Sequence, residues 1–198
     1  MNPGNRIGVI ERKTKETAVA AKVNLDGTGE AKVSTGIGFF DHMLISWARF
    51  AYFDLELQAQ GDLQVDAHHT IEDCGIVLGQ VMKEALGEKQ GIERFGDTLL
   101  PMDESLVQVA IDISNRPFLV WDVDLPDSMV GDFPAEMAEE FFRALAFNAG
   151  ITLHIRLLSG KNLHHSLEGI FKGVGRALGL AMRVNERYQG VLSTKGIL

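Results

Sequence analysis

The sequence predicts an α+β fold made of two fused β-β-α-β-α repeats, each a sheet with helices on one face, with the two helix layers packed together. The first observation is a motif in which a histidine pair is followed three residues later by a glutamate. It occurs at residues 68–72 and again, 96 residues on, at residues 164–168. The second observation is that strand-like alternation precedes each copy and a helical pattern follows it, so whole structural units are repeated.

The first half contains two strands, a helix, a third strand and a second helix. Alternation of apolar and polar residues marks the strands, and apolar residues at helical spacing mark the helices. Asp26-Gly27 supplies turn chemistry between the first two strands. In chain order the predicted elements are residues 16–27, 30–34, 39–51, 53–60 and 72–86.

The second half repeats this order. Its first two strands are joined by Asn115-Arg116-Pro117, a combination typical of turns. In chain order the predicted elements are residues 105–114, 117–124, 136–150, 152–158 and 168–182. The two halves therefore offer the same set of amphipathic elements, which can bury their helix layers against each other.

We place the boundary between the halves near residue 95, with residues 1–95 in the first repeat and residues 96–198 in the second. The joint is expected at residues 91–97, which lack the Ser, Gly and Pro enrichment of a flexible linker. We therefore expect one compact two-lobed unit rather than two independent domains.

Composition excludes several classes of protein. A formal net charge of −8 argues against nucleic acid as a partner, because phosphate backbones attract a basic surface. The N-terminal segment lacks the apolar core of a signal peptide, and no apolar run approaches the roughly 20 residues of a membrane helix. With a single cysteine, Cys74, the expectation is a soluble cytoplasmic protein without disulfides.

The repeated histidine pairs suggest metal ligands. His68 and Glu72 are four residues apart, so on a helix they project from one face, and His164 and Glu168 repeat that relation. The second histidine of each pair points roughly 100° away, which favours two ions or two protein surfaces. Nitrogen and oxygen ligands without thiolates suit Mn, Fe, Co or Zn in an open site rather than a structural zinc cluster.

Two alternatives compete with this interpretation. A single histidine near a helix start usually caps or packs, but packing has no reason to require the same pair twice. A ferritin-like di-metal bundle also uses Glu and His, but it needs long helices that this chain lacks. Two further positions are plausible ligands by symmetry, because His42 and Glu140 lie 98 residues apart on the equivalent helices.

Several motifs together carry a family resemblance: GFFDHML, DAHHTIEDCGIVLG, RFGD, MDESL, NRPF and TLHIRLLSGKNLHHSLEGIFKGVGRAL. With these in place, the chain resembles the imidazoleglycerol-phosphate dehydratase family over essentially its full length. The resemblance implies conversion of imidazole-glycerol phosphate to imidazole-acetol phosphate in histidine biosynthesis. It also implies two Mn²⁺ ions per active site, an octahedral 24-subunit assembly and active sites built between chains.

The resemblance further implies how the ligands are shared. One metal would take His68, Glu72 and His165, and the other would take His42, His69, His164 and Glu168. Family members commonly carry a histidine at the last ligand position of the first site, where this chain has Glu140. A carboxylate can bind Mn²⁺, so Glu140 is the expected ligand there.

Proton transfer and phosphate binding complete the implied site. Glu16 and Glu168 are the candidates for general acid–base catalysis. Asp103 matches a substrate contact of the family. The family's phosphate contacts match Arg94, Arg116, Lys172, Ser193 and Lys195. The chain departs from the family at Ser46 and Phe50, where Gln and His are common near the phosphate, so its phosphate contacts are expected to differ in detail.

The chemistry explains the use of two metals. The proton to be removed is not acidified by a carbonyl, whereas an imidazolate held between two cations can expel the neighbouring hydroxyl through a diazafulvene-like intermediate. Two other functions stay open on sequence alone. One is a related metal-dependent hydrolase of a small phosphorylated substrate, and the other is a non-catalytic metal-binding assembly protein.

Overall fold

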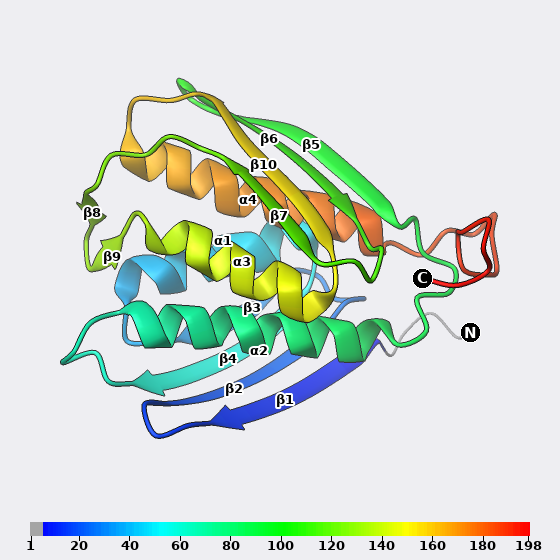
Figure 1. Ribbon diagram of the computed structural model, residues 1–198, viewed down its shortest axis with the longest axis horizontal. Helices are drawn as coiled ribbons and strands as arrows, with labels where there is room; N and C mark the ends of the chain where they lie inside the picture. Colours follow the sequence, from blue (N-terminus) through cyan, green and yellow to red (C-terminus); the bar gives the residue numbers. More distant parts are fainter. Residues whose placement is uncertain (1–5) are drawn as a thin grey trace.

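The computed structural model describes residues 6–198, in which two four-stranded sheets enclose a layer of helices (Figure 1). The first half contains β1 (Ile7–Lys13), β2 (Thr17–Asn24), β3 (Ala31–Ser34), α1 (Gly38–Ala51), β4 (Asp54–Gly61) and α2 (His68–Leu86). The second half contains β5 (Phe95–Met102), β6 (Ser105–Asp112), β7 (Phe118–Asp122), α3 (Met137–Ala149), β10 (Thr152–Ser159) and α4 (Leu163–Met182), with the short β8 (Met129–Val130) and β9 (Phe133–Pro134) before α3.

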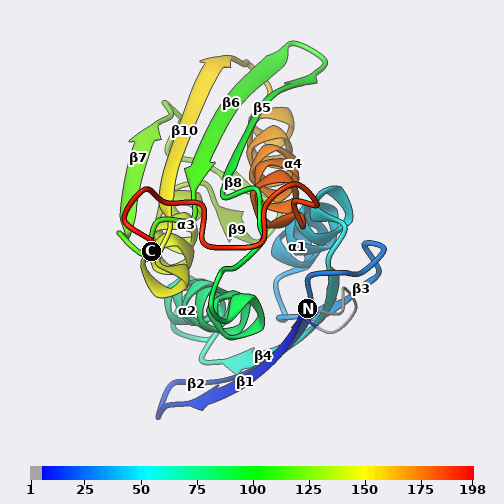
Figure 2. The same ribbon diagram turned by 90° about the vertical axis from the view of Figure 1, so that its right-hand side faces the viewer.

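The two sheets have the same topology. Their strand orders are β1-β2-β4-β3 and β5-β6-β10-β7, and in each the last pair is parallel while the others are antiparallel. Each sheet covers one side of the helix layer, which is clearest in the turned view (Figure 2). The predicted α+β class, with two duplicated units and packed helix layers, is confirmed.

Each half begins with a strand that the sequence does not predict, and the second half also contains the short β8 and β9. The two leading strands share a feature. These strands, β1 and β5, lie at sheet edges, and their core-facing positions are not a run of large apolar residues. In β1 the one buried residue is Gly8, and in β5 the buried residues are Gly96, Thr98 and Leu100. Edge strands with small inward residues give a weak alternation signal, so sequence pattern alone misses them.

The helices pair across the two halves rather than within them. In the first pair, α1 lies against α4, and in the second, α2 lies against α3. Gly175 sits so close to the Trp47 carbonyl that a Cβ would overlap it, and a Cβ on Gly79 would lie 2.7 Å from the Leu145 carbonyl oxygen. Backbone therefore meets backbone at both crossings, and one continuous core forms.

Large aromatic side chains fill the centre of this core. Phe40 stands edge-on to Phe141 with ring centroids 5.2 Å apart, and Phe171 stacks on Phe141 at 5.4 Å. These residues come from both halves and are fully buried. Burying them stabilises the contact between the halves, because aromatic side chains remove the most apolar area from water.

The helices all begin at the end of the molecule where β8 and β9 lie (Figure 1). Their common direction agrees with the packing, since Gly175 and Gly179 of α4 meet Trp47 and Ala51 of α1 in the same order. The C-terminal segment lies at the opposite end, near the last turn of α4. In the described part of the chain, no helix combines the length and apolar character needed to cross a membrane.

Candidate metal centre and anion pocket

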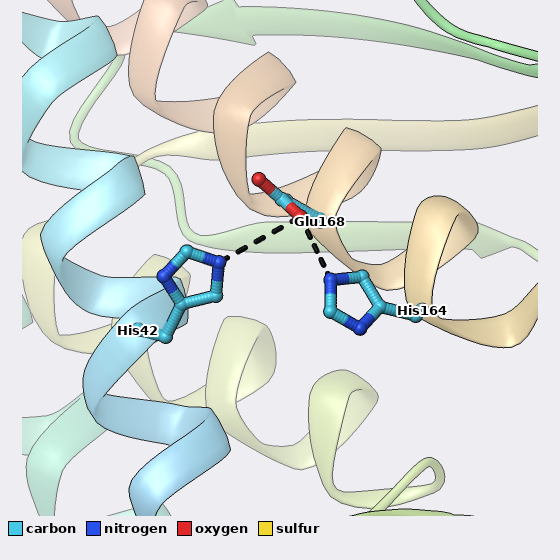
Figure 3. Close-up of side chains that lie close together, drawn as sticks. All are labelled: His42, His164 and Glu168. Carbon is cyan, nitrogen blue, oxygen red and sulfur yellow. Dashed lines mark hydrogen bonds and ion pairs between the residues drawn. The ribbon is translucent and has the colours of Figure 1, made fainter.

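Three predicted ligands meet where α1 and α4 begin. The ligand atoms of His42, His164 and Glu168 lie within 4.8 Å of one another (Figure 3). Glu168 Oε2 is 3.0 Å from His164 Nε2 and 3.7 Å from His42 Nε2. Two imidazole nitrogens and one carboxylate oxygen converging on one point form a donor set that fits a divalent transition metal. The arrangement is therefore a candidate metal site.

Glu168 is the buried member of this cluster, at 7% exposure. Its second oxygen, Oε1, lies 2.7 Å from Lys172 Nζ. Burial opposes the charged form, but the hydrogen bonds and charges of Lys172 and His164 outweigh it and hold the pKa of Glu168 below its ordinary value. The carboxylate is therefore ionised at neutral pH, as a ligand or proton acceptor must be.

Three further predicted ligands belong to the equivalent helix pair, α2 and α3. His68 Nε2 lies 3.9 Å from Glu72 Oε2, and both side chains are nearly half exposed. Glu140, near the start of α3, has a carboxylate oxygen 3.9 Å from Arg143 Nε. Because α2 and α3 run in the same direction, their first turns share one end of the molecule. This half-site is more open than the first.

The second histidine of each pair turns away from these groups within one chain. His69 Nδ1 lies 3.0 Å from Asp62, and His165 Nδ1 lies 2.9 Å from Glu104. Hydrogen bonds to these carboxylates raise the pKa of both histidines. Within residues 6–198, the structure does not bring His69 to the His42 cluster or His165 to His68 and Glu72, so the crosswise sharing implied by the resemblance is not met inside one chain.

Glu16 lies in the turn between β1 and β2, with its side chain exposed. The Thr14 hydroxyl accepts hydrogen bonds from the backbone N–H groups of Glu16 and Thr17, at 3.1 and 2.9 Å. The Thr17 hydroxyl in turn donates to Asp73 on α2, which also pairs with Arg12 at 2.6 Å. This network ties the Glu16 turn to the helix that carries His68 and His69.

Basic and hydroxyl side chains gather at the other end of the molecule. A pocket of about 720 Å³ is lined by predicted phosphate contacts from the residue just before β5, the turn after β6 and the C-terminal segment: Arg94, Arg116, Ser193 and Lys195. Arg116 is exposed, and among residues 6–198 its guanidinium has a single ion-pair contact, at 3.4 Å to Asp112. An exposed guanidinium with unused N–H groups suits recognition of a phosphate.

Arg94 is more heavily engaged. Its Nε and one Nη donate hydrogen bonds to the Asp112 carboxylate at 2.7 and 3.1 Å, and its other Nη donates to the Leu192 carbonyl at 2.7 Å. Three of its five N–H groups are therefore occupied. In this chain Arg94 holds the C-terminal segment beside Arg116, so that Ser193 and Lys195 face the same pocket.

The remaining predicted contacts lie elsewhere. Lys172 belongs to the His42 cluster and lies over the Phe50 ring at 5.3 Å, while Ser46 is buried on α1. Asp103 sits in the β5–β6 turn, exposed, with a carboxylate oxygen 3.7 Å from His165 Nε2. The predicted phosphate contacts thus lie in two separate places, with Lys172 beside Glu168 and the others in the pocket with Arg116.

Four carboxylates that sequence reasoning missed support these residues: Asp62, Asp73, Glu104 and Asp112. Asp73 and Glu104 stand directly beside residues that the sequence did mark, Glu72 and Asp103. Their position next to Glu72 and Asp103 could have marked them as candidates. Their hydrogen-bond partners Thr17 and His165, however, lie at least 56 residues away in the chain, which a local pattern does not show.

Comparison with known proteins gives a consistent result. The family model described as imidazoleglycerol-phosphate dehydratase matches residues 35–178. The chain is 72% identical to the imidazoleglycerol-phosphate dehydratase of Desulfitobacterium hafniense (strain Y51), over 98% of each chain, and 55% identical to that of Acetivibrio thermocellus, over 96% of this chain and 97% of the other.

Solved structures agree with the sequence comparison. The Staphylococcus aureus imidazoleglycerol-phosphate dehydratase is similar with a TM-score of 0.82 and 38% identity, covering 90% of this chain and 99% of the other. The Pyrococcus furiosus protein in complex with (S)-C348 is similar with a TM-score of 0.83 and 39% identity, covering 96% of this chain and all of the other.

Proposed function

The chain belongs to the imidazoleglycerol-phosphate dehydratase family and is a dehydratase of histidine biosynthesis, and we propose that it works with two Mn²⁺ ions at sites shared between chains. Its reaction converts imidazole-glycerol phosphate to imidazole-acetol phosphate. The observation that carries the metal proposal is the cluster of His42, His164 and Glu168. No observation favours a hydrolase or a non-catalytic assembly protein over the dehydratase.

We assign the ligands as the resemblance implies. His42, His164 and Glu168 would hold one ion together with His69, and His68, Glu72 and Glu140 would hold the other together with His165. When bound, the cations would stabilise negative charge on the substrate's imidazole ring. The side chains of His68 and Glu72 are nearly half exposed, which leaves room beside them for additional metal ligands.

The chain's own carboxylates would move the protons. Glu168 is ionised and anchored by Lys172, so its Oε2 can accept a proton beside the two histidines. Glu16 is exposed on a turn that Thr14 and Asp73 hold in place, so its carboxylate can reach a substrate without reorganising the sheet. We propose these two as the general acid and base.

The phosphate would bind in the pocket of Arg116, Arg94, Ser193 and Lys195. This pocket lies near the C-terminal turn of α4, since the backbone N–H of Arg94 donates to the Ala181 carbonyl at 2.8 Å. His164 lies at the other end of that helix, and 17 residues of helix span roughly 25 Å. A small substrate cannot contact the metal cluster and the phosphate pocket of the same chain at once. This supports active sites completed by a neighbouring subunit.

A 24-subunit octahedral assembly belongs to the same proposal, as does a cytoplasmic location. The buried Cys74 is compatible with a reducing compartment. Exposed Phe95, Leu99 and Phe118 on the second sheet offer apolar area that assembly would cover.

Removing the metal tests the proposal most directly. Exhaustive chelation is expected to lower turnover by about 10²-fold or more, because the ions contribute several kcal/mol of charge stabilisation. Adding Mn²⁺ back should restore product formation. The measurement is imidazole-acetol phosphate release, with metal content determined on the same samples. Full turnover in protein shown to be metal-free would contradict the proposal.

Complementation between inactive variants tests the shared sites. His164→Asn impairs the metal end and Arg116→Ala impairs the phosphate end, so each assembly alone is expected to be nearly inactive. Co-assembly of the two variants should regain activity, because some sites then take an intact metal end from one chain and an intact phosphate end from another. Mixed assemblies without any regained activity would show that one chain supplies both ends.

A further inference from the structure

The duplication extends to a pair of glutamates that the sequence motifs do not align. In the first sheet Val23 pairs with Leu55, and in the second sheet Ile111 pairs with Leu153. Counting back six residues from Val23 and from Ile111 places Thr17 and Ser105 at equivalent positions. The residues just before them, Glu16 and Glu104, therefore occupy the same place in the first hairpin of each half.

The two glutamates have different surroundings. One oxygen of the Glu104 carboxylate is 2.9 Å from His165 Nδ1, and the other accepts from the backbone N–H groups of Asn162 and Lys161, at 2.7 and 3.2 Å. These bonds, the one with His165 above all, lower the pKa of Glu104 to about 2. For Glu16, the described residues show no hydrogen bond to the carboxylate. Hydrogen bonds therefore hold the carboxylate of Glu104 in place, whereas the carboxylate of its counterpart Glu16 is not held in this way.

In the first half, a different carboxylate holds the equivalent histidine. Asp62, which directly follows β4, contacts His69 Nδ1 through both oxygens, at 3.2 and 3.0 Å. The Asp62 side chain is mostly buried, at 16% exposure. Two unrelated positions thus make the same contact to the second histidine of each pair, which packing alone would not require.

We propose that Glu104 and Asp62 are positioning residues, each accepting the Nδ1–H of His165 or His69 and so presenting that histidine's Nε2 lone pair to a metal. This inference rests on the proposed ligand roles of the two histidines. Fixing Nδ1–H on a carboxylate selects the tautomer that can ligate through Nε2 and holds the ring plane. Because Asp62 takes this task in the first half, the Glu16 carboxylate is left available for proton transfer.

The test is Mn²⁺ affinity of the metal-free, assembled protein, measured by titration at a temperature well below unfolding. Glu104→Gln and Asp62→Asn keep the side-chain shape but remove the anionic acceptor. Each is expected to weaken Mn²⁺ binding at one class of site by about 10- to 100-fold. Glu11→Gln, an exposed change on β1, is the matched control and should leave the affinity unchanged.

A second measurement separates positioning from stability. The thermal midpoint of the metal-free Asp62→Asn protein should stay near that of the wild type, while the rise in midpoint on adding Mn²⁺ should shrink. A wild-type affinity in both variants would overturn the inference. So would an affinity loss that merely tracks a lower midpoint of the metal-free protein.

His165→Asn distinguishes the two levels of the proposal. If this variant binds Mn²⁺ as tightly as the wild type, the ligand role of His165 fails and the positioning role of Glu104 fails with it. If His165→Asn loses affinity and Glu104→Gln does not, the ligand role stands and the positioning role is wrong.

Discussion

Glu168→Gln is expected to lower kcat by about 10²–10⁴-fold, the range for loss of a general acid–base group. The substitution also removes the anion that His42, His164 and Lys172 face. An amide oxygen is a weaker ligand than a carboxylate, and the Lys172 ammonium loses its partner. Both the proton transfer and the metal site should therefore suffer.

The measurement is product formation at saturating substrate and Mn²⁺, with bound metal determined in parallel. Glu56→Gln is a suitable control, because Glu56 lies on the outer face of β4 and pairs with Lys22 at the surface. We expect the control to keep wild-type turnover. A Glu168→Gln protein with kcat within a few-fold of wild type would remove Glu168 from the mechanism.

Gly175→Ala is expected to destabilise the folded chain by overpacking the contact between α1 and α4. The new Cβ would overlap the Trp47 carbonyl oxygen, with the carbonyl carbon and Cα at 3.0 and 3.2 Å. Those are backbone atoms, so α1 and α4 must move apart. Overpacking of this kind costs about 1–3 kcal/mol. For a chain of this length, the thermal midpoint should fall by about 2–12 °C.

Thermal unfolding of the metal-free protein measures this effect without interference from ligand binding. Gly38→Ala is the matched control, because a Cβ there meets nothing within 4 Å. It should leave the midpoint unchanged or raise it slightly, since alanine favours helix. A Gly175→Ala protein that melts at or above the wild-type temperature would contradict the close helix contact.

Most of the fold could be predicted from the sequence because its elements are amphipathic and occur twice. Strands such as β2 and β6 place apolar residues at every second position, and the helices carry wide apolar faces. The strands β1 and β5 could not be predicted in this way, since their inward positions are largely glycine or polar. The pairing of α1 with α4 rather than with α2 is a long-range choice that no local pattern encodes.

For the site, the residue pattern predicted the ligand types but only part of their arrangement. His42, His164 and Glu168 meet, as symmetry and resemblance together implied. The carboxylates that hold His69 and His165 were both missed. Glu104 comes from a distant hairpin, whereas Asp62 lies seven residues before His69 but outside the repeated motif. Lys172 was expected with the phosphate contacts, and in one chain it lies beside Glu168 because both occupy the same helix face, four residues apart.

The crossing of helices between the halves has a consequence for how the protein responds to dilution. The α1–α4 and α2–α3 contacts are formally an interface between two similar units joined by a peptide linker. Covalent connection gives these units a high effective concentration, so their association does not depend on how much protein is present. The cluster of His42, His164 and Glu168 spans this interface and therefore persists in an isolated chain. A metal ligand supplied by another chain has no such covalent connection. Dilution should therefore break the contacts between chains before it disturbs the cluster within one chain.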